Sequence, residues 1–210
     1  MLIKICGITA PMGAVECFEA GADMIGLVYY PASPRHVDAS QISKILDAVE
    51  AYRQIDRKIV LVTVDDFPDS IDSRIDFIQC YGKHFDGFSE KMIPVVKDRR
   101  TVERFLTEAE TGPKPSFYVL EMSRGKLPGG NGLPWNWFEA QAFCHRFPTL
   151  LAGGIGPENV LEVLETADPA GIDVSSGVES SPGVKDRGKI AALIDQVRKY
   201  SISMMKGGNR

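Results

Sequence analysis

Two glycine-rich junctions near the C-terminus have the composition of a phosphate-binding site. The apolar run 150–152 leads into Gly-Gly-Ile-Gly, and the run 171–174 leads into Ser-Ser-Gly. Unpaired backbone N–H groups at the starts of helices attract anions, and glycine lets the backbone come close to them. The residues we expect to bind a phosphate group are Gly153, Gly154, Ile155, Ser175, Ser176 and Gly177.

Two candidates for proton transfer stand at the ends of apolar runs. Cys6 ends the run 2–6, and Glu121 ends the run 116–121. A thiol beside Lys4 and near the start of a helix can act as a base, because positive potential lowers its pKa. A carboxyl group at a buried strand end can keep its proton, because burial raises its pKa. The alternatives are a buried packing cysteine and a salt-bridged glutamate at the rim.

Arg35 and Asp173 are candidates for binding substrate. Arg35 lies in a loop stiffened by Pro31 and Pro34, and a guanidinium held in a fixed place can bind a carboxylate with two hydrogen bonds. The alternative is a solvated surface arginine. Asp173 alternates with apolar neighbours, so it points into the protein, where a charge needs a partner. That partner is a substrate hydroxyl or Lys4.

Composition and charge exclude several classes of protein. The net charge is −4 and no basic patch stands out, which argues against nucleic acid as a partner. The apolar runs are strand-length, so we expect no membrane segment. The start of the chain resembles a strand rather than a signal peptide, which predicts a cytoplasmic protein. The four cysteines form no Cys-x-x-Cys pair, so neither a metal site nor a disulfide framework is expected.

Short β-branched runs alternate with helix-length amphipathic segments along the chain. The predicted strands are 2–6, 23–28, 58–64, 75–79, 92–96, 116–121, 149–152 and 171–174. The predicted helices are 10–20, 38–53, 67–73, 84–90, 98–110, 135–147, 157–167 and 185–199. Strict alternation is typical of a parallel sheet, and eight units favour a closed (β/α)₈ barrel. Catalytic groups of such barrels lie where the strands end and the following loops begin.

We expect one α/β domain, a (β/α)₈ TIM barrel over residues 1–203, followed by a frayed tail over 204–210. The irregular stretch 122–134 follows the sixth predicted strand and is a candidate lid over the barrel mouth.

Four segments resemble the motifs of the phosphoribosylanthranilate isomerase family of tryptophan biosynthesis. They are Lys4–Thr9, Ser33–Val37, Leu151–Val160 and Gly171–Glu179. The resemblance spans nearly the whole chain. It implies a (β/α)₈ barrel that catalyses an Amadori rearrangement of N-(5-phosphoribosyl)anthranilate, without a cofactor. The expected partner is a small phosphorylated substrate, and the oligomeric state is monomer or homodimer.

The same resemblance implies roles for individual residues. Cys6 would be the general base, and Glu121 would stand at the position of the acid. Arg35 would bind the anthranilate carboxylate, Asp173 would orient the sugar, and Gln79 would contact the substrate.

The chain departs from the family pattern in the loops after strands four and six. Glu121 replaces the usual aspartate and is one methylene longer. Gln-Cys-Tyr-Gly at 79–82 replaces Gln-Leu-His-Gly, Gly-Gly-Asn-Gly at 129–132 replaces Gly-Gly-Thr-Gly, and Asn136 replaces the aspartate of Asp-Trp. Two alternatives therefore stand beside the isomerase. One is a diverged barrel isomerase that acts on another phosphosugar amine, and the other is a non-catalytic protein that binds a phosphorylated ligand.

Overall fold

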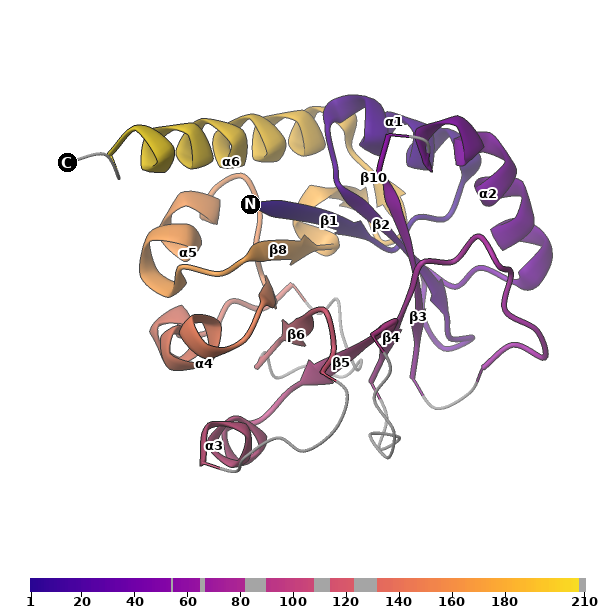
Figure 1. Ribbon diagram of the computed structural model, residues 1–210. Coiled ribbons are helices and arrows are strands. Elements are labelled where there is room, and N and C mark those ends of the chain that lie inside the picture. The colour runs from indigo at the N-terminus through magenta and orange to yellow at the C-terminus, as the bar shows by residue number, and fades with distance from the viewer. Residues whose placement is uncertain (54, 65–66, 82–89, 108–113, 123–131, 208–210) are drawn as a thin grey trace.

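Eight parallel strands form a closed barrel in chain order in the computed structural model, which describes residues 1–53, 55–64, 67–81, 90–107, 114–122 and 132–207 (Figure 1). The barrel strands are β1 (Leu2–Cys6), β2 (Met24–Tyr29), β3 (Lys58–Thr63), β4 (Phe77–Cys80), β5 (Met92–Val96), β6 (Tyr118–Leu120), β7 (Thr149–Ala152) and β8 (Gly171–Val174). β8 pairs with β1 and closes the barrel. The predicted (β/α)₈ architecture is confirmed.

Alternation along the strands separates two buried layers. Val60, Val62, Ile93, Val95 and Val119 pack together inside the barrel. The residues between them on the same strands, such as Ile59 and Leu61, belong to a second cluster beneath the helices. Because successive side chains of a strand point to opposite faces, each strand serves both layers.

Six α-helices lie within the described residues and cover the outside of the barrel (Figure 1). They are α1 (Pro11–Ala20), α2 (Ala39–Arg53), α3 (Arg99–Thr107), α4 (Gln141–Arg146), α5 (Val160–Ala167) and α6 (Arg187–Gly207). The apolar faces predicted for α2 and α6 are buried, including Ile45 and Leu46 in α2 and Leu193 and Val197 in α6. None of the helices in the described part of the chain is long and apolar enough to cross a membrane.

The prediction of a helix at 67–73 is wrong, because the structure has irregular backbone over these residues. Pro68 restricts the backbone there, and the side chain of Asp72 accepts a hydrogen bond from the backbone N–H of Arg74 at 2.9 Å. Such local bonds compete with helix formation, and seven residues are too few to offset the cost of nucleation. Most of the helix predicted at 84–90 lies outside the described residues.

Other elements differ in extent. The segment predicted as one helix at 135–147 begins as the 3₁₀ helix η1 (Trp137–Ala140) before α4, and α5 begins three residues later than predicted. After β8 the 3₁₀ helix η2 (Ser176–Val178) leads into an antiparallel hairpin, β9 (Glu179–Ser181) and β10 (Val184–Lys185), which we did not predict. α6 continues to Gly207, so residues 204–207 of the expected frayed tail are helical.

Candidate active site

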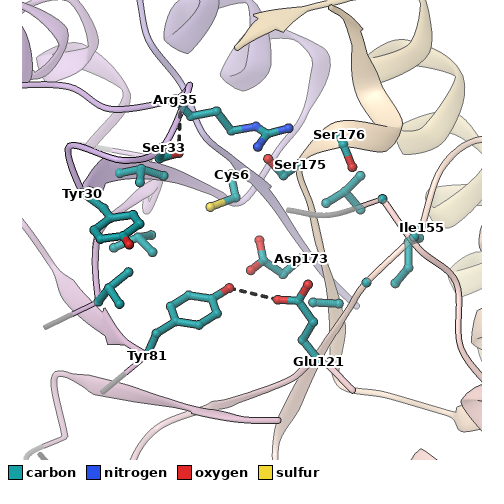
Figure 2. A pocket seen from close by; sticks show the side chains of 18 residues that line it. Cys6, Tyr30, Ser33, Arg35, Tyr81, Glu121, Ile155, Asp173, Ser175 and Ser176 are labelled. Atoms are coloured by element: carbon teal, nitrogen blue, oxygen red, sulfur yellow. Dashed lines mark hydrogen bonds between the residues drawn. The ribbon is translucent and has the colours of Figure 1, made fainter. Parts of the chain in front are cut away.

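One pocket opens where the barrel strands end and encloses about 720 Å³ of empty space, part of it in the open mouth. Its lining brings together four of the predicted site residues, Cys6, Glu121, Arg35 and Asp173 (Figure 2). Gly153, Gly154, Ile155, Ser175 and Ser176 line it as well. Gln79 and Gly177 do not line this pocket. The ends of β1, β7 and β8 and the loops after β2, β4 and β6 therefore meet at one site, as the position rule for barrels predicts.

Cys6 ends β1 with its thiol at the pocket. Its relative exposure is 8%, and it packs with the interior layer of the barrel. Burial raises the pKa of the Cys6 thiol, although the charges of Lys4 and Lys185 act in the opposite direction. The expectation that positive potential leaves this thiol with a lowered pKa is therefore wrong. The lysine charge only offsets part of the effect of desolvation.

Lys4 and Asp173 form a buried ion pair between the first and the last strand. The two residues are neighbours in the β1–β8 register, and Lys4 Nζ donates to Asp173 Oδ1 at 2.8 Å. Burial alone would lower the pKa of Lys4, but Asp173 and Cys6 outweigh it, so that pKa lies above its ordinary value. Of the two partners predicted for Asp173, Lys4 is present, and the carboxylate still reaches the pocket lining.

Arg35 is buried rather than solvated, which rules out the surface alternative. Its Nε and Nη2 donate to the two carboxylate oxygens of Glu179 at 2.8 and 2.7 Å. Gly7 lets Arg35 come this close to the end of β1, because a Cβ at Gly7 would lie 2.4 Å from Arg35 Cδ. The hydrogen bonds to Glu179 and its charge raise the pKa of Arg35 despite burial. The guanidinium has five N–H donors, and this pair uses two of them.

Glu179 and Lys185 lie behind the pocket lining and support it through Arg35 and Ser175, and the sequence alone did not predict this role. Lys185 Nζ donates to Glu179 Oε1 at 2.7 Å and to the backbone oxygen of Ser175 at 3.1 Å. Burial would raise the pKa of Glu179, but Arg35 and Lys185 outweigh it and hold that pKa below its ordinary value. The hairpin β9–β10 supplies both residues. The sequence offered one signal for this pair, the acidic Glu179 at the end of the segment 171–179, because a buried arginine needs an acidic partner.

Glu121 follows β6 and is almost completely buried. Its relative exposure is 2%, and its backbone N–H donates to Val96 O at 3.0 Å. Tyr81 Oη donates to Glu121 Oε2 at 3.1 Å (Figure 2). Gln79, inside the barrel, donates from Nε2 to Tyr81 Oη at 3.4 Å. Gln79 therefore touches Tyr81 rather than the pocket surface.

The two glycine-rich loops after β7 and β8 lie against each other. A Cβ on Gly177 would lie 2.0 Å from Ile155 O, so only glycine allows this contact. The Gly156 N–H is occupied by Asn159 Oδ1 at 2.9 Å, which leaves Gly156 out of the candidate anion site. Ser175 Oγ is buried at the pocket and has no hydrogen-bond partner among the described residues. A ligand with acceptor oxygens would satisfy it.

The candidate lid at 122–134 falls mostly outside the described residues, as do Gly129, Gly130 and Asn131. The C-terminal end of this segment, residues 132–134, is described and lies beside β7 and the loop that follows it. Trp135 Nε1 donates to Ala152 O at 2.9 Å, and Pro134 lies beside Gly154. This end of the segment is thus fixed next to the loop after β7.

A family model and the curated relatives identify one family. The family model described as N-(5'phosphoribosyl)anthranilate (PRA) isomerase matches residues 3–196. The N-(5'-phosphoribosyl)anthranilate isomerase of Desulfatibacillum aliphaticivorans is 37% identical over 209 residues, which cover 95% of this chain and 94% of that protein.

Solved structures of phosphoribosyl anthranilate isomerases are similar to this chain over nearly its whole length. The phosphoribosyl anthranilate isomerase from Thermotoga maritima superposes with a TM-score of 0.77 at 28% identity, over 95% of this chain and 100% of that one. A phosphoribosyl anthranilate isomerase in complex with reduced 1-(o-carboxyphenylamino)-1-deoxyribulose 5-phosphate superposes with a TM-score of 0.74 at 27% identity, with 95% and 100% coverage.

Proposed function

Because this chain belongs to the N-(5'-phosphoribosyl)anthranilate isomerase family, we propose that it isomerises N-(5-phosphoribosyl)anthranilate to 1-(2-carboxyphenylamino)-1-deoxyribulose 5-phosphate. This Amadori rearrangement is a step of tryptophan biosynthesis. One observation carries the proposal: a thiol, a carboxyl group, a guanidinium and two glycine-rich loops line the same pocket at the strand ends.

Glu121 is the general acid of the proposed reaction. It donates a proton to the furanose ring oxygen while the bond between that oxygen and C1 breaks. The lone pair of the substrate nitrogen moves toward C1, and a protonated imine results. The ring oxygen leaves as a hydroxyl group, and Glu121 is left as a carboxylate.

Cys6, as its thiolate, is the general base. It takes the proton from C2, and the electrons of that C–H bond form a double bond that neutralises the imine and gives an enolamine. The enolamine becomes the ketone when the Cys6 thiol returns its proton to C1 and the C2 hydroxyl gives its proton to the Glu121 carboxylate, so both groups recover their starting forms. Atoms and charge balance, and since no electrons leave the substrate, the reaction needs no redox cofactor.

Binding groups hold the substrate across the pocket. The loops after β7 and β8, with Ser175 Oγ, hold the phosphate, while Arg35 binds the anthranilate carboxylate and Asp173 orients the sugar hydroxyls. The related isomerase that binds a reduced phosphorylated product supports a ligand of this chemistry. Binding energy from the phosphate positions C1 and C2 between the acid and the base.

We propose a small phosphorylated substrate as the partner of this chain and the cytoplasm as its location, since charged phosphate esters do not cross membranes unaided. A monomer and a homodimer both suit a site that a single chain supplies.

Complementation tests the proposed function in a cell. The gene should restore growth without tryptophan to a strain that lacks this isomerase, and the Glu121→Gln variant, which keeps the shape but has no acidic proton, should not. Failure of the wild-type gene, with the protein present at normal levels, would favour a diverged substrate or a binding protein.

A further inference from the structure

We propose that Tyr81 is a positioning residue that holds the carboxyl group of Glu121 in the orientation for proton donation. This inference rests on the proposed function, because Glu121 is the acid of that reaction. Tyr81 follows β4 and Glu121 follows β6, so the hydrogen bond between them spans the end of β5 (Figure 2). It joins two of the loops in which this chain departs from its family.

The hydrogen bonds form a chain from Gln79 through Tyr81 to Glu121. Gln79 donates from Nε2 to Tyr81 Oη, and an amide nitrogen cannot accept. The hydroxyl proton of Tyr81 is then directed to Glu121 Oε2. Gln79 is fully buried on β4 and contacts the tyrosine hydroxyl from inside the barrel. A rigid strand thus sets the position of the carboxyl group of a residue two strands away.

The hydrogen bond distinguishes the two oxygens of Glu121. Oε2 accepts from Tyr81, so in the carboxylic acid the proton belongs on Oε1, which Figure 2 shows turned away from Tyr81. When that proton leaves, negative charge develops on the carboxylate. A hydrogen bond to a charged acceptor is stronger than one to a neutral acceptor, so the Tyr81 hydroxyl also stabilises the product of the transfer.

The surroundings keep Tyr81 a donor. Burial raises the pKa of Tyr81 well above its ordinary value, and the negative charge that Glu121 carries after the proton transfer raises it further, so the hydroxyl of Tyr81 stays protonated in both states. The charged and titratable groups that face the pair, among the described residues, are Cys6, Asp173, Arg35 and Lys97. Lys97 Nζ lies 5.7 Å from the centre of the Tyr81 ring.

Steady-state kinetics of purified Tyr81→Phe, with N-(5-phosphoribosyl)anthranilate as substrate, tests this role. We expect kcat to fall by about 10- to 100-fold, because a misplaced acid slows proton transfer, while KM changes by less than about three-fold, because the aromatic ring that residue 81 contributes to the pocket lining is kept. Tyr118→Phe is the matched control. It removes the hydroxyl of another buried tyrosine, three residues before Glu121 but in the layer beneath the helices, and should leave kcat unchanged.

A double-variant comparison separates positioning from general damage. In the Glu121→Asp background we expect the carboxyl group, shorter by one methylene, to lose the 3.1 Å hydrogen bond to the Tyr81 hydroxyl, so adding Tyr81→Phe should change kcat by less than about three-fold. An equal loss in both backgrounds would overturn the inference. So would a kcat for Tyr81→Phe within two-fold of an active wild type, and in that case the proposed function would stand.

A titration without substrate tests the hydrogen bond even if the wild type proves inactive, a result that would count against the function alone. Carbon-13 NMR of the Glu121 carboxyl, assigned with Glu121→Gln, should give a higher pKa in Tyr81→Phe than in wild type, by about half a unit or more, because the lost hydrogen bond had favoured the carboxylate. An unchanged pKa would overturn the inference.

Discussion

Cys6 combines two properties that act against each other. Its place at the end of β1 puts the thiol at the reacting end of the barrel, but burial there raises its pKa. The ordinary pKa of a cysteine is 9.0, so the thiolate is a minor form near neutral pH. Only a small fraction of the molecules therefore carries Cys6 as the thiolate that the proposed reaction needs. Lys4 increases this fraction because its charge stabilises the thiolate.

The reactivity of Cys6 should consequently increase into the alkaline range. Only the thiolate reacts with iodoacetamide, so the alkylation rate of Cys6 should reach half its maximum above pH 9.0, the ordinary value for a thiol. Mass spectrometry of peptides after timed quenching measures the rate at each pH, with N-acetylcysteine in the same solution as the reference. A midpoint below that of the reference would show that positive charge outweighs burial.

Arg35 should contribute mainly to substrate affinity. Arg35→Ala removes a charged hydrogen bond of about 1.5–3 kcal/mol, so KM should rise about ten-fold or more. Arg35→Lys keeps the charge but loses the paired hydrogen bonds to Glu179 that hold the side chain in place, and its KM should lie between that of Arg35→Ala and that of wild type. Steady-state kinetics gives both values, and melting curves show whether the folded state persists. An unchanged KM in both variants would mean that the carboxylate binds elsewhere.

The periodicity of apolar residues predicted most of the strands and helices correctly, and the exceptions have local causes. Strands β1, β5, β7 and β8 have the predicted bounds, because buried parallel strands are continuous apolar runs between turns. The segment 67–73 failed because Pro68 and the Asp72 turn compete with a short helix. The hairpin β9–β10 was missed because its five strand residues have no apolar alternation, and Glu179 and Lys185 were missed with it.

The contact between the loops after β7 and β8 is a requirement of the proposed phosphate site. Gly177→Ala would place a methyl group 2.0 Å from Ile155 O and push the loops apart. We expect a lower melting temperature and weaker binding of inorganic phosphate, measured by calorimetry. Gly13→Ala in α1 is the matched control, because its added methyl group meets nothing within 4 Å. That variant should be more stable, by about 0.5–1 kcal/mol. Phosphate affinity equal to wild type in Gly177→Ala would place the anion elsewhere.

The barrel closes through the pairing of β1 with β8, and the buried Lys4–Asp173 ion pair joins these two strands. The closed topology and the strand ends that form the site follow from the alternating pattern of the sequence. The pairing of Arg35 with Glu179 and of Tyr81 with Glu121 does not, because each joins residues far apart in the chain whose distance depends on side-chain packing.

Breaking the Lys4–Asp173 pair should destabilise the whole barrel. Lys4→Met leaves Asp173 as a buried charge without its partner, which costs about 3–5 kcal/mol. Lys4→Met combined with Asp173→Asn removes both charges and should recover most of that loss. Urea denaturation measures the free energy of unfolding of the three proteins. A single variant as stable as wild type would mean that the pair contributes nothing to closure.

The fluorescence of N-(5-phosphoribosyl)anthranilate decays as this substrate is isomerised, so its time course after addition of purified protein measures the proposed reaction itself. We expect turnover by the wild type and, for Cys6→Ser, a kcat lower by about 10²-fold or more, since a serine hydroxyl ionises far less readily than a thiol and general base catalysis supplies factors of this size. The melting temperature of that variant should barely change. A wild-type protein that leaves the fluorescence constant would contradict the proposed function, and a Cys6→Ser variant that turns over at the wild-type rate would contradict the assignment of Cys6 as the base.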